Sequence, residues 1–362
     1  MTRLERYIAR QWLAWFFVFG IIFCAAIWLI DLVEQARTVG TKANVALTES
    51  AVLAALKLPM LFAEVLPFLI LATTIITYAR LGRRKELPVI QTSGLSSLSV
   101  LRPAMILTLL IGVLNITLLN PYGAETTASF EEKRAAALRG SNPKSQLRPI
   151  WLREQQGVIT RLISASQSDM GEHDFSRISI IEIDMSAPEG AQFQRRIEAE
   201  TGFWADNVWH LSNVSEQSRL DPPGHFDAVT LPSEQDPSRL LSRTITRKTV
   251  GFWDLPREIS LRAASGQSVG RFVMRLFELL ASPLHLLAMA LIGGMACLRL
   301  DRLGQTTIRI AVSSGAALVL FLSVQFGISL GASGQLPIIL AAFGPPVAAC
   351  LIALTLLTSN MH

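Results

Sequence analysis

The chain has 362 residues, half of them hydrophobic, with a mean hydropathy of +0.39 and a formal net charge of +5. A water-soluble globular domain is not expected to repeat apolar runs of about 20 residues, the length that a hydrocarbon core requires. The composition therefore indicates an integral membrane protein. The three cysteines, Cys24, Cys297 and Cys350, all lie in apolar runs, so they predict neither a disulfide framework nor a metal site.

The apolar runs form two blocks, 12–122 and 269–357, and each block divides into three runs long enough to cross a bilayer. The first run is followed by no small-residue cleavage site and by further spans, which favours a retained helix over a signal peptide. We therefore predict a helical membrane protein with six transmembrane helices, at 12–33, 52–79, 100–121, 271–297, 306–329 and 337–357.

Basic residues predict the orientation of these spans. Eleven of them gather before the first span, between spans two and three, and between spans four and five: Arg3, Arg6, Arg10, Arg80, Arg83, Arg84, Lys85, Arg102, Arg299, Arg302 and Arg309. The short loops of the opposite face hold only Arg37 and Lys42. This asymmetry predicts that both termini are cytoplasmic and that the segment 123–269 lies outside the cytoplasm.

The segment 123–269 separates two helical regions, 1–122 and 270–362, and begins with a short polar helix near 126–138. Alternation of apolar and polar residues then predicts strands at 150–152, 158–163, 178–183, 193–199, 208–211 and 242–246. Short strands without intervening helices predict an inserted all-β, jelly-roll-like domain. Its alternating apolar residues form either a packed core or an apolar groove: Ile150, Leu152, Ile159, Leu162, Ile180, Ile197, Trp209 and Leu211.

The sequence contains no pattern typical of an enzyme. The histidines of the central segment, His173, His210 and His225, are scattered, and no carboxylate follows at a catalytic or metal-ligand spacing. A phosphate-binding loop with the pattern GxxxxGK[ST] is also absent from the sequence. We therefore expect no catalytic residue, metal or cofactor in this chain.

The loop between spans two and three, Arg83–Gly94, begins with charges, continues as a short amphipathic stretch and ends in glycine. It predicts a short helix at about 84–94 along the membrane surface, with Pro88 in the first turn, where a missing N–H is tolerated. Such a helix is either a passive interfacial segment or a contact for a cytoplasmic partner.

This loop and the layout of three spans, a domain and three spans resemble the permease subunits of the lipopolysaccharide-export ABC transporter, the YjgP/YjgQ (LptF/LptG) family. The resemblance covers nearly the whole chain and extends to Arg6-Tyr7-Ile8, Pro59, Pro67, Pro283 and Gly334–Pro337. Asp31–Gln35 and Trp209-His210-Leu211 are more similar to the LptG-type subunit than to the LptF-type subunit. Pro88 and Phe343–Pro346 depart from the family pattern.

The resemblance implies a non-catalytic permease of the Gram-negative inner membrane, with a periplasmic β-jellyroll domain. Such a subunit extracts lipopolysaccharide and passes it to a periplasmic bridge for outer-membrane biogenesis. The implied partners are an LptF-type sister permease, an LptB-type ATPase dimer that binds ATP and Mg²⁺, and an LptC-type bridge protein. An alternative is a non-transporting, membrane-anchored scaffold whose periplasmic domain binds a partner.

The resemblance also implies two sites. ATPase coupling is expected at Arg83, Arg84, Glu86, Gln91 and Gly94, with Glu86 pairing with a basic residue of the ATPase. Lipopolysaccharide binding is expected at cations near the outer interface and at apolar residues of the fifth span: Arg37, Lys42, Lys57, Arg271, Phe321, Phe326 and Ile328. For Arg37, snorkelling toward ordinary lipid headgroups is an equal alternative to phosphate binding.

Span four contains a carboxylate, Glu278, three residues after Arg275. A charge inside a membrane is costly unless it is paired, so an ion pair between these neighbours is the simplest prediction. We expect a structural role for the pair. Proton coupling through Glu278 and His285 is the open alternative.

Overall fold

The structure is a computed structural model that describes residues 3–40, 46–92, 96–141, 150–156, 159–167, 174–184, 192–205, 207–218, 222, 224–233, 249–264, 268–298 and 306–359. The chain divides into a helical unit, Met1–Leu138 with Arg247–His362, and a β unit, Arg139–Thr246. The limits of the β unit fall inside the segment 123–269 that was expected from the sequence.

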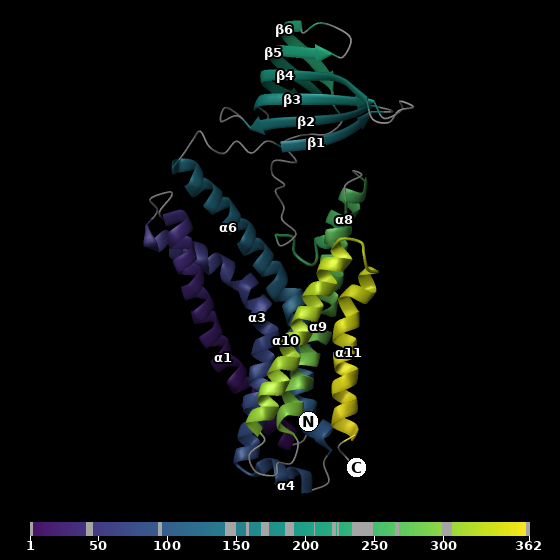
Figure 1. Cartoon of the computed structure of the whole chain (residues 1–362). Helices are drawn as coiled ribbons and strands as arrows, with labels where there is room; N and C mark the ends of the chain where they lie inside the picture. The colour runs from purple at the N-terminus through teal and green to yellow at the C-terminus, as the bar shows by residue number, and fades with distance from the viewer. Residues whose placement is uncertain are drawn as a thin grey trace. The chain divides into compact units, whose positions relative to one another are not determined.

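The helical unit contains the predicted spans. Its elements are α1 (Arg3–Gln35), η1 (Ala36–Gly40), α3 (Leu47–Arg83), α4 (Glu86–Thr92), α5 (Ser97–Leu114), η2 (Asn115–Leu119), α6 (Asn120–Ser141), α8 (Leu255–Ala264), α9 (Gly270–Cys297), α10 (Thr306–Ala332) and α11 (Ile338–Ser359). Within the described ranges, six helical stretches are long and apolar enough to cross a membrane, which confirms the six predicted spans. The beginning of α1, the end of α11 and the short helix α4 all lie at one end of this unit (Figure 1).

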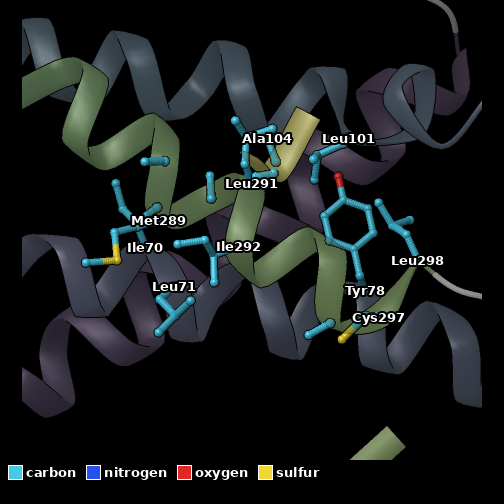
Figure 2. Close-up of a cluster of buried hydrophobic side chains, with 14 of the residues drawn as sticks. Ile70, Leu71, Tyr78, Leu101, Ala104, Met289, Leu291, Ile292, Cys297 and Leu298 are labelled. Carbon is cyan, nitrogen blue, oxygen red and sulfur yellow. The ribbon is translucent and has the colours of Figure 1, made fainter. Parts of the chain in front are cut away.

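Helix α9 is the centre of the helical unit and contacts α3, α5, α10 and α11. Small residues permit this close packing. A Cβ added to Gly112 of α5 would lie 2.7 Å from the Cα of Pro283 in α9. Figure 2 shows the core that results, with side chains from α3, α5, α9 and the residue that follows α9: Ile70, Leu71, Tyr78, Leu101, Ala104, Met289, Leu291, Ile292, Cys297 and Leu298.

Helices α5 and α6 are joined by the π-helical segment η2, so the third span continues without a break into the polar helix that was expected separately near 126–138. Pro121 has no N–H to donate to the carbonyl of Thr117, four residues earlier. The indole Nε1 of Trp253 donates to that carbonyl instead, at 3.3 Å, and the N–H of Phe252 donates to Asn120 Oδ1 at 2.9 Å. These bonds fix the returning chain, just before α8, to the end of the third span that continues into α6.

The β unit is one antiparallel sheet of six described strands: β1 (Ile150–Gln156), β2 (Ile159–Gln167), β3 (Asp174–Asp184), β4 (Gln192–Ala205), β5 (Val208–Ser218) and β6 (Gly224–Pro232). Each strand pairs with the next in sequence, as Figure 1 shows. The described strands therefore form a meander, without the crossover connections of a jelly roll. The predicted strand at 242–246 lies outside the described residues, and β6 had not been expected.

The sheet curls strongly on itself. Arg161 of β2 donates from Nη1 to the carbonyl of Pro232 at the end of β6, at 2.7 Å. In a flat sheet these strands would lie about 19 Å apart, four strand spacings. The inward face buries a row of isoleucines, Ile163, Ile180 and Ile197, which are paired across β2, β3 and β4. Of the eight alternating residues, Ile180, Ile197, Trp209 and Leu211 pack in this interior, which supports the core interpretation for them. Ile159 and Leu162 are only half-buried, and the side chains of Ile150 and Leu152 lie outside those that the structure describes.

Candidate functional site

The turn that leads into α4 exposes its charged residues. Lys85 adopts a φ of 59°, the left-handed conformation that ends α3, and α4 then begins at Glu86. Pro88 is the third residue of α4, inside the first turn, where the sequence required it. The helix covers Glu86–Thr92, shorter than the expected 84–94, and Gly94 lies outside the described residues.

Glu86 is held by residues of its own chain. The hydroxyl of Tyr7, in α1, donates to Glu86 Oε2 at 3.1 Å, and Arg84 Nη1 lies 3.9 Å from Glu86 Oε1. The Glu86 side chain is one-third exposed, so it remains accessible from water. Sequence reasoning found Glu86 but missed Tyr7 as its partner, because 79 residues separate them.

A pocket of about 490 Å³ lies beside this contact, between the first turns of α1 and helix α4. Apolar and charged side chains line it together: Leu4, Tyr7, Arg84, Lys85, Glu86, Val89 and Ile90. Val89 is 68% exposed although it is apolar. Gln91 belongs to the same short helix, and Arg83 ends α3 just before the turn. This surface, called the α4 surface below, combines a charged carboxylate with an apolar groove.

At the opposite end of α1 and α3, Lys57 is already neutralised within the chain. Its Nζ lies 2.8 Å from Asp31 Oδ1, and Gln35 Nε2 donates to the other oxygen of Asp31 at 3.4 Å. Asp31 is buried, and the ring of Phe130 lies 5.8 Å from the ammonium. Lys57 was predicted to bind lipid, and the sequence did not reveal its carboxylate partner.

The other predicted lipid-binding cations occupy different settings. Arg37 is exposed and lies in η1, a π-helical turn, a type of turn found often at functional sites. Arg271 is exposed in the first turn of α9. Lys42 lies outside the described residues. The structure thus brings Lys57 together with Asp31, while Arg37 and Arg271 face outward from their helices.

The three apolar candidates of α10 differ from one another in exposure. Phe326 is 68% exposed. Phe321 packs on Phe68 of α3, with ring centroids 4.9 Å apart. Ile328 is buried in a small cluster with Met274 and other residues of α9 and α11. Phe326 is therefore the one of the three that presents a large apolar surface outside the chain.

Arg275 and Glu278 form an ion pair in the first half of α9. Arg275 Nη1 donates to Glu278 Oε1 at 2.8 Å, and both side chains are largely buried. His285, two turns further along α9, is buried among apolar neighbours. The short contact supports a structural role for the pair, because each charge is compensated inside the span.

A ladder of alternating charges crosses the sheet of the β unit. Arg161 lies 3.7 Å from Glu154 and 2.8 Å from Glu182, and Arg195 lies 2.6 Å from Glu182 and 3.1 Å from Glu216. Burial alone would raise the pKa of Glu182. The hydrogen bonds and charges of Arg195 and Arg161 outweigh burial and hold that pKa below its ordinary value. This charge ladder links five neighbouring strands.

Metal chemistry finds no support in the part of the chain that the structure describes. Within it, no group of three or more His, Cys, Asp or Glu side chains is arranged to hold a metal ion.

Comparison with protein families matches residues 6–359 to the family described as lipopolysaccharide export system permease LptF/LptG. The match covers nearly the whole chain, including both helical regions and the β unit. No curated protein matches the chain.

Proposed function

Because the chain belongs to the LptF/LptG family of lipopolysaccharide export permeases, we propose that it is the LptG-type subunit of such a transporter in the bacterial inner membrane. Its basic end faces the cytoplasm and its β unit the periplasm, as the charge asymmetry of the loops favours. The observation that carries the proposal is the α4 surface. There an accessible carboxylate stands beside an apolar groove, at the end of the helical unit where α1 begins and α11 ends (Figure 1).

The α4 surface is the place where the partner ATPase acts. An LptB-type ATPase dimer binds ATP and Mg²⁺ and moves α4, while an LptF-type sister permease completes the membrane assembly. Val89 fits an apolar hollow of the ATPase, and Glu86 pairs with a basic residue there. Tyr7 transmits the movement to α1, because its hydroxyl joins that helix to Glu86.

Assembly is tested by copurification of the full-length chain with its sister permease and ATPase. Glu86→Lys reverses the charge of the α4 surface, and Glu49→Lys makes the same reversal at an exposed residue in the first turn of α3. We expect Glu86→Lys to weaken ATPase retention and Glu49→Lys to leave it intact. Equal retention of the ATPase by both variants would favour the scaffold alternative.

Lipopolysaccharide, an anionic lipid with several acyl chains, contacts the outer halves of α1, α9 and α10. Cations at the rim suit its phosphates, and exposed apolar side chains suit its acyl chains. Arg37 and Arg271 are better placed than Lys57 for this role, because their side chains are exposed whereas Lys57 lies half-buried against Asp31. Phe326 is the apolar residue of α10 best placed to touch an acyl chain.

The lipid path is tested with a photoreactive amino acid at Phe326 in the assembled complex. Leu351 of α11, which is 59% exposed, provides a control position of similar exposure. We expect lipopolysaccharide to be labelled from position 326 and labelled more strongly when ATP is withheld and substrate is retained. Equal labelling from both positions would mean that the path does not follow α10.

From the membrane, the substrate passes to the β unit and on to a periplasmic bridge protein with an LptC-type anchor. The interior of the β unit is filled by its own side chains, so acyl chains enter it only if those side chains separate. The strands of the curled sheet surround this one interior, so acyl chains that entered it would lie among all of them.

A further inference from the structure

A second pocket at the basic end of the helical unit shares Arg83 and Arg84 with the predicted coupling residues but contains neither Glu86 nor any other residue of α4. It has a volume of about 390 Å³ and lies between α1 and α3. Its lining combines an indole, an aliphatic side chain and a cluster of guanidinium groups: Trp15, Ile76, Arg80, Arg83 and Arg84. A pocket of this volume is within the usual range of small-molecule sites, roughly 300–1,000 Å³.

Arg80 and Arg83 stand at positions i and i+3 on one face at the end of α3, and Arg84 follows directly as the residue that caps the helix. Like charges at this spacing repel each other and destabilise a helix. In the described ranges, no carboxylate forms an ion pair with Arg80 or Arg83. The ion pair of Arg84 with Glu86 is long, at 3.9 Å, and therefore weak. The cluster therefore carries positive charge that an anion in the pocket would compensate.

Arg80 is oriented for such an anion before it arrives. Its guanidinium lies over the Trp15 ring, with Cζ 4.8 Å from the centroid. A guanidinium stacked on an aromatic face keeps its N–H donors free in its own plane, where they match the oxygens of a phosphate. The walls are fixed as well, because Trp12 Nε1 donates to Thr74 Oγ1 at 3.1 Å in a buried contact between α1 and α3.

The pocket lies at the boundary between apolar and charged parts of the spans. Ile76 and Trp15 belong to the apolar runs, whereas the arginines mark the end of α3. On α1, Val18 and Ile22 continue the face of Trp15 toward the membrane centre and are 45% and 55% exposed. A ligand that fits both parts has a phosphate in the pocket and an acyl chain along this face.

We propose that this pocket binds the phosphate of an anionic phospholipid in the leaflet at the basic face of the membrane. The ligand is a phosphodiester lipid, held by Arg80 and Arg83 with the indole of Trp15 beneath. Arg84 lines this pocket and also borders the α4 surface, so a bound phosphate draws it away from Glu86. That effect on α4 rests on the proposed function, whereas lipid binding does not.

Native mass spectrometry of the full-length chain tests binding directly, with dioleoyl phosphatidylglycerol and zwitterionic dioleoyl phosphatidylcholine as probes. We expect a preference for phosphatidylglycerol whose half-saturation concentration rises about tenfold in Arg80→Gln, because one charge-assisted contact is lost. Arg80→Lys keeps the positive charge but lacks the planar guanidinium, so its half-saturation concentration should lie between those of the wild type and Arg80→Gln. Arg10→Gln removes an exposed arginine of α1 that does not line the pocket and retains the wild-type preference.

Three results would overturn the proposal. These are no preference for phosphatidylglycerol in the wild type, equal effects of Arg80→Gln and Arg10→Gln, or displacement of the lipid by millimolar inorganic phosphate, which would make the pocket a site for soluble anions. Phosphatidylcholine binding that stays equal among the variants shows that each is folded. None of these readouts requires lipopolysaccharide transport, so a failed transport experiment leaves the lipid result standing.

Discussion

The hydroxyl of Tyr7 donates a hydrogen bond to Glu86 Oε2 at 3.1 Å and so joins the first helix of the chain to the short helix α4. Since α1 runs from this contact to η1 at the opposite end of the same span, one continuous helical stretch connects the α4 surface with the segment that carries Arg37. We therefore propose that movement of α4 is transmitted along α1 toward Arg37, one of the predicted lipid-binding residues.

Tyr7→Phe removes this bond and little else. We expect the ATPase concentration at half-maximal binding to rise about two- to fivefold, because a single exposed hydrogen bond to a charged group contributes roughly 0.5–1 kcal/mol. Tyr122→Phe, at an exposed tyrosine of α6, is the matched control. If both variants bind the ATPase equally well, Tyr7 does not position α4.

Asp31→Asn leaves the Lys57 ammonium without its carboxylate in a half-buried position. We expect the free energy of unfolding to fall by about 1–2 kcal/mol, between the values for surface and buried pairs. Thermal unfolding of the purified chain measures this. The double variant Asp31→Asn/Lys57→Gln should recover part of the loss, and a double variant less stable than Asp31→Asn would contradict the pairing.

Acid should loosen the β unit at the charge ladder. Because the pKa of Glu182 is lowered in the folded state, its contribution is complete above the ordinary glutamate pKa and is lost as the pH falls through the lowered value. We expect faster hydrogen–deuterium exchange, corrected for the intrinsic pH dependence, in β3 and β4 of the intact protein below about pH 4.5. Glu182→Gln should show fast exchange at neutral pH already and a flatter pH profile. Exchange in the wild type that does not change with pH would contradict the role of Glu182.

The close contact of α5 with α9 can be tested at Gly112. A Cβ there would lie 2.7 Å from Pro283 Cα, so Gly112→Ala must push the helices apart, at a cost of about 1–3 kcal/mol. Gly20→Ala in α1 places its Cβ where no atom lies within 4 Å and should stabilise the helix slightly. Thermal unfolding of the two variants should therefore shift in opposite directions, and equal shifts would contradict the packing.

The spans were predictable because membrane insertion demands long apolar runs, and composition alone reveals them. Strands with regular alternation were predictable too, and Ile180, Ile197 and Trp209 are buried as expected. Leu162 was expected to face inward, yet Ile163 does so. Arg161 occupies an inward position of β2, and a charged residue there hides the alternation of apolar and polar residues. Its burial is possible because carboxylates of other strands compensate its charge.

Contacts between distant parts of the chain could not be predicted. Asp31 lies 26 residues from Lys57, and nothing in either local sequence marks them as a pair. The pocket at Arg80 depends likewise on how α1 is oriented about its own axis when it packs on α3, because that orientation places Trp15 next to the guanidinium. Sequence patterns show which residues share one helix face, whereas these sites require the packing of two helices.

ATP-driven release of lipopolysaccharide from proteoliposomes tests the proposed role most directly. The chain is reconstituted with its sister permease and ATPase, and ATP turnover and lipopolysaccharide transfer to the bridge protein are measured in the same sample. We predict that release follows ATP turnover in the wild type and in Glu49→Lys, and that Glu86→Lys abolishes release. Release from Glu86→Lys at the wild-type rate would contradict coupling through α4, and no ATP-dependent release from the wild-type complex would contradict the transport function itself.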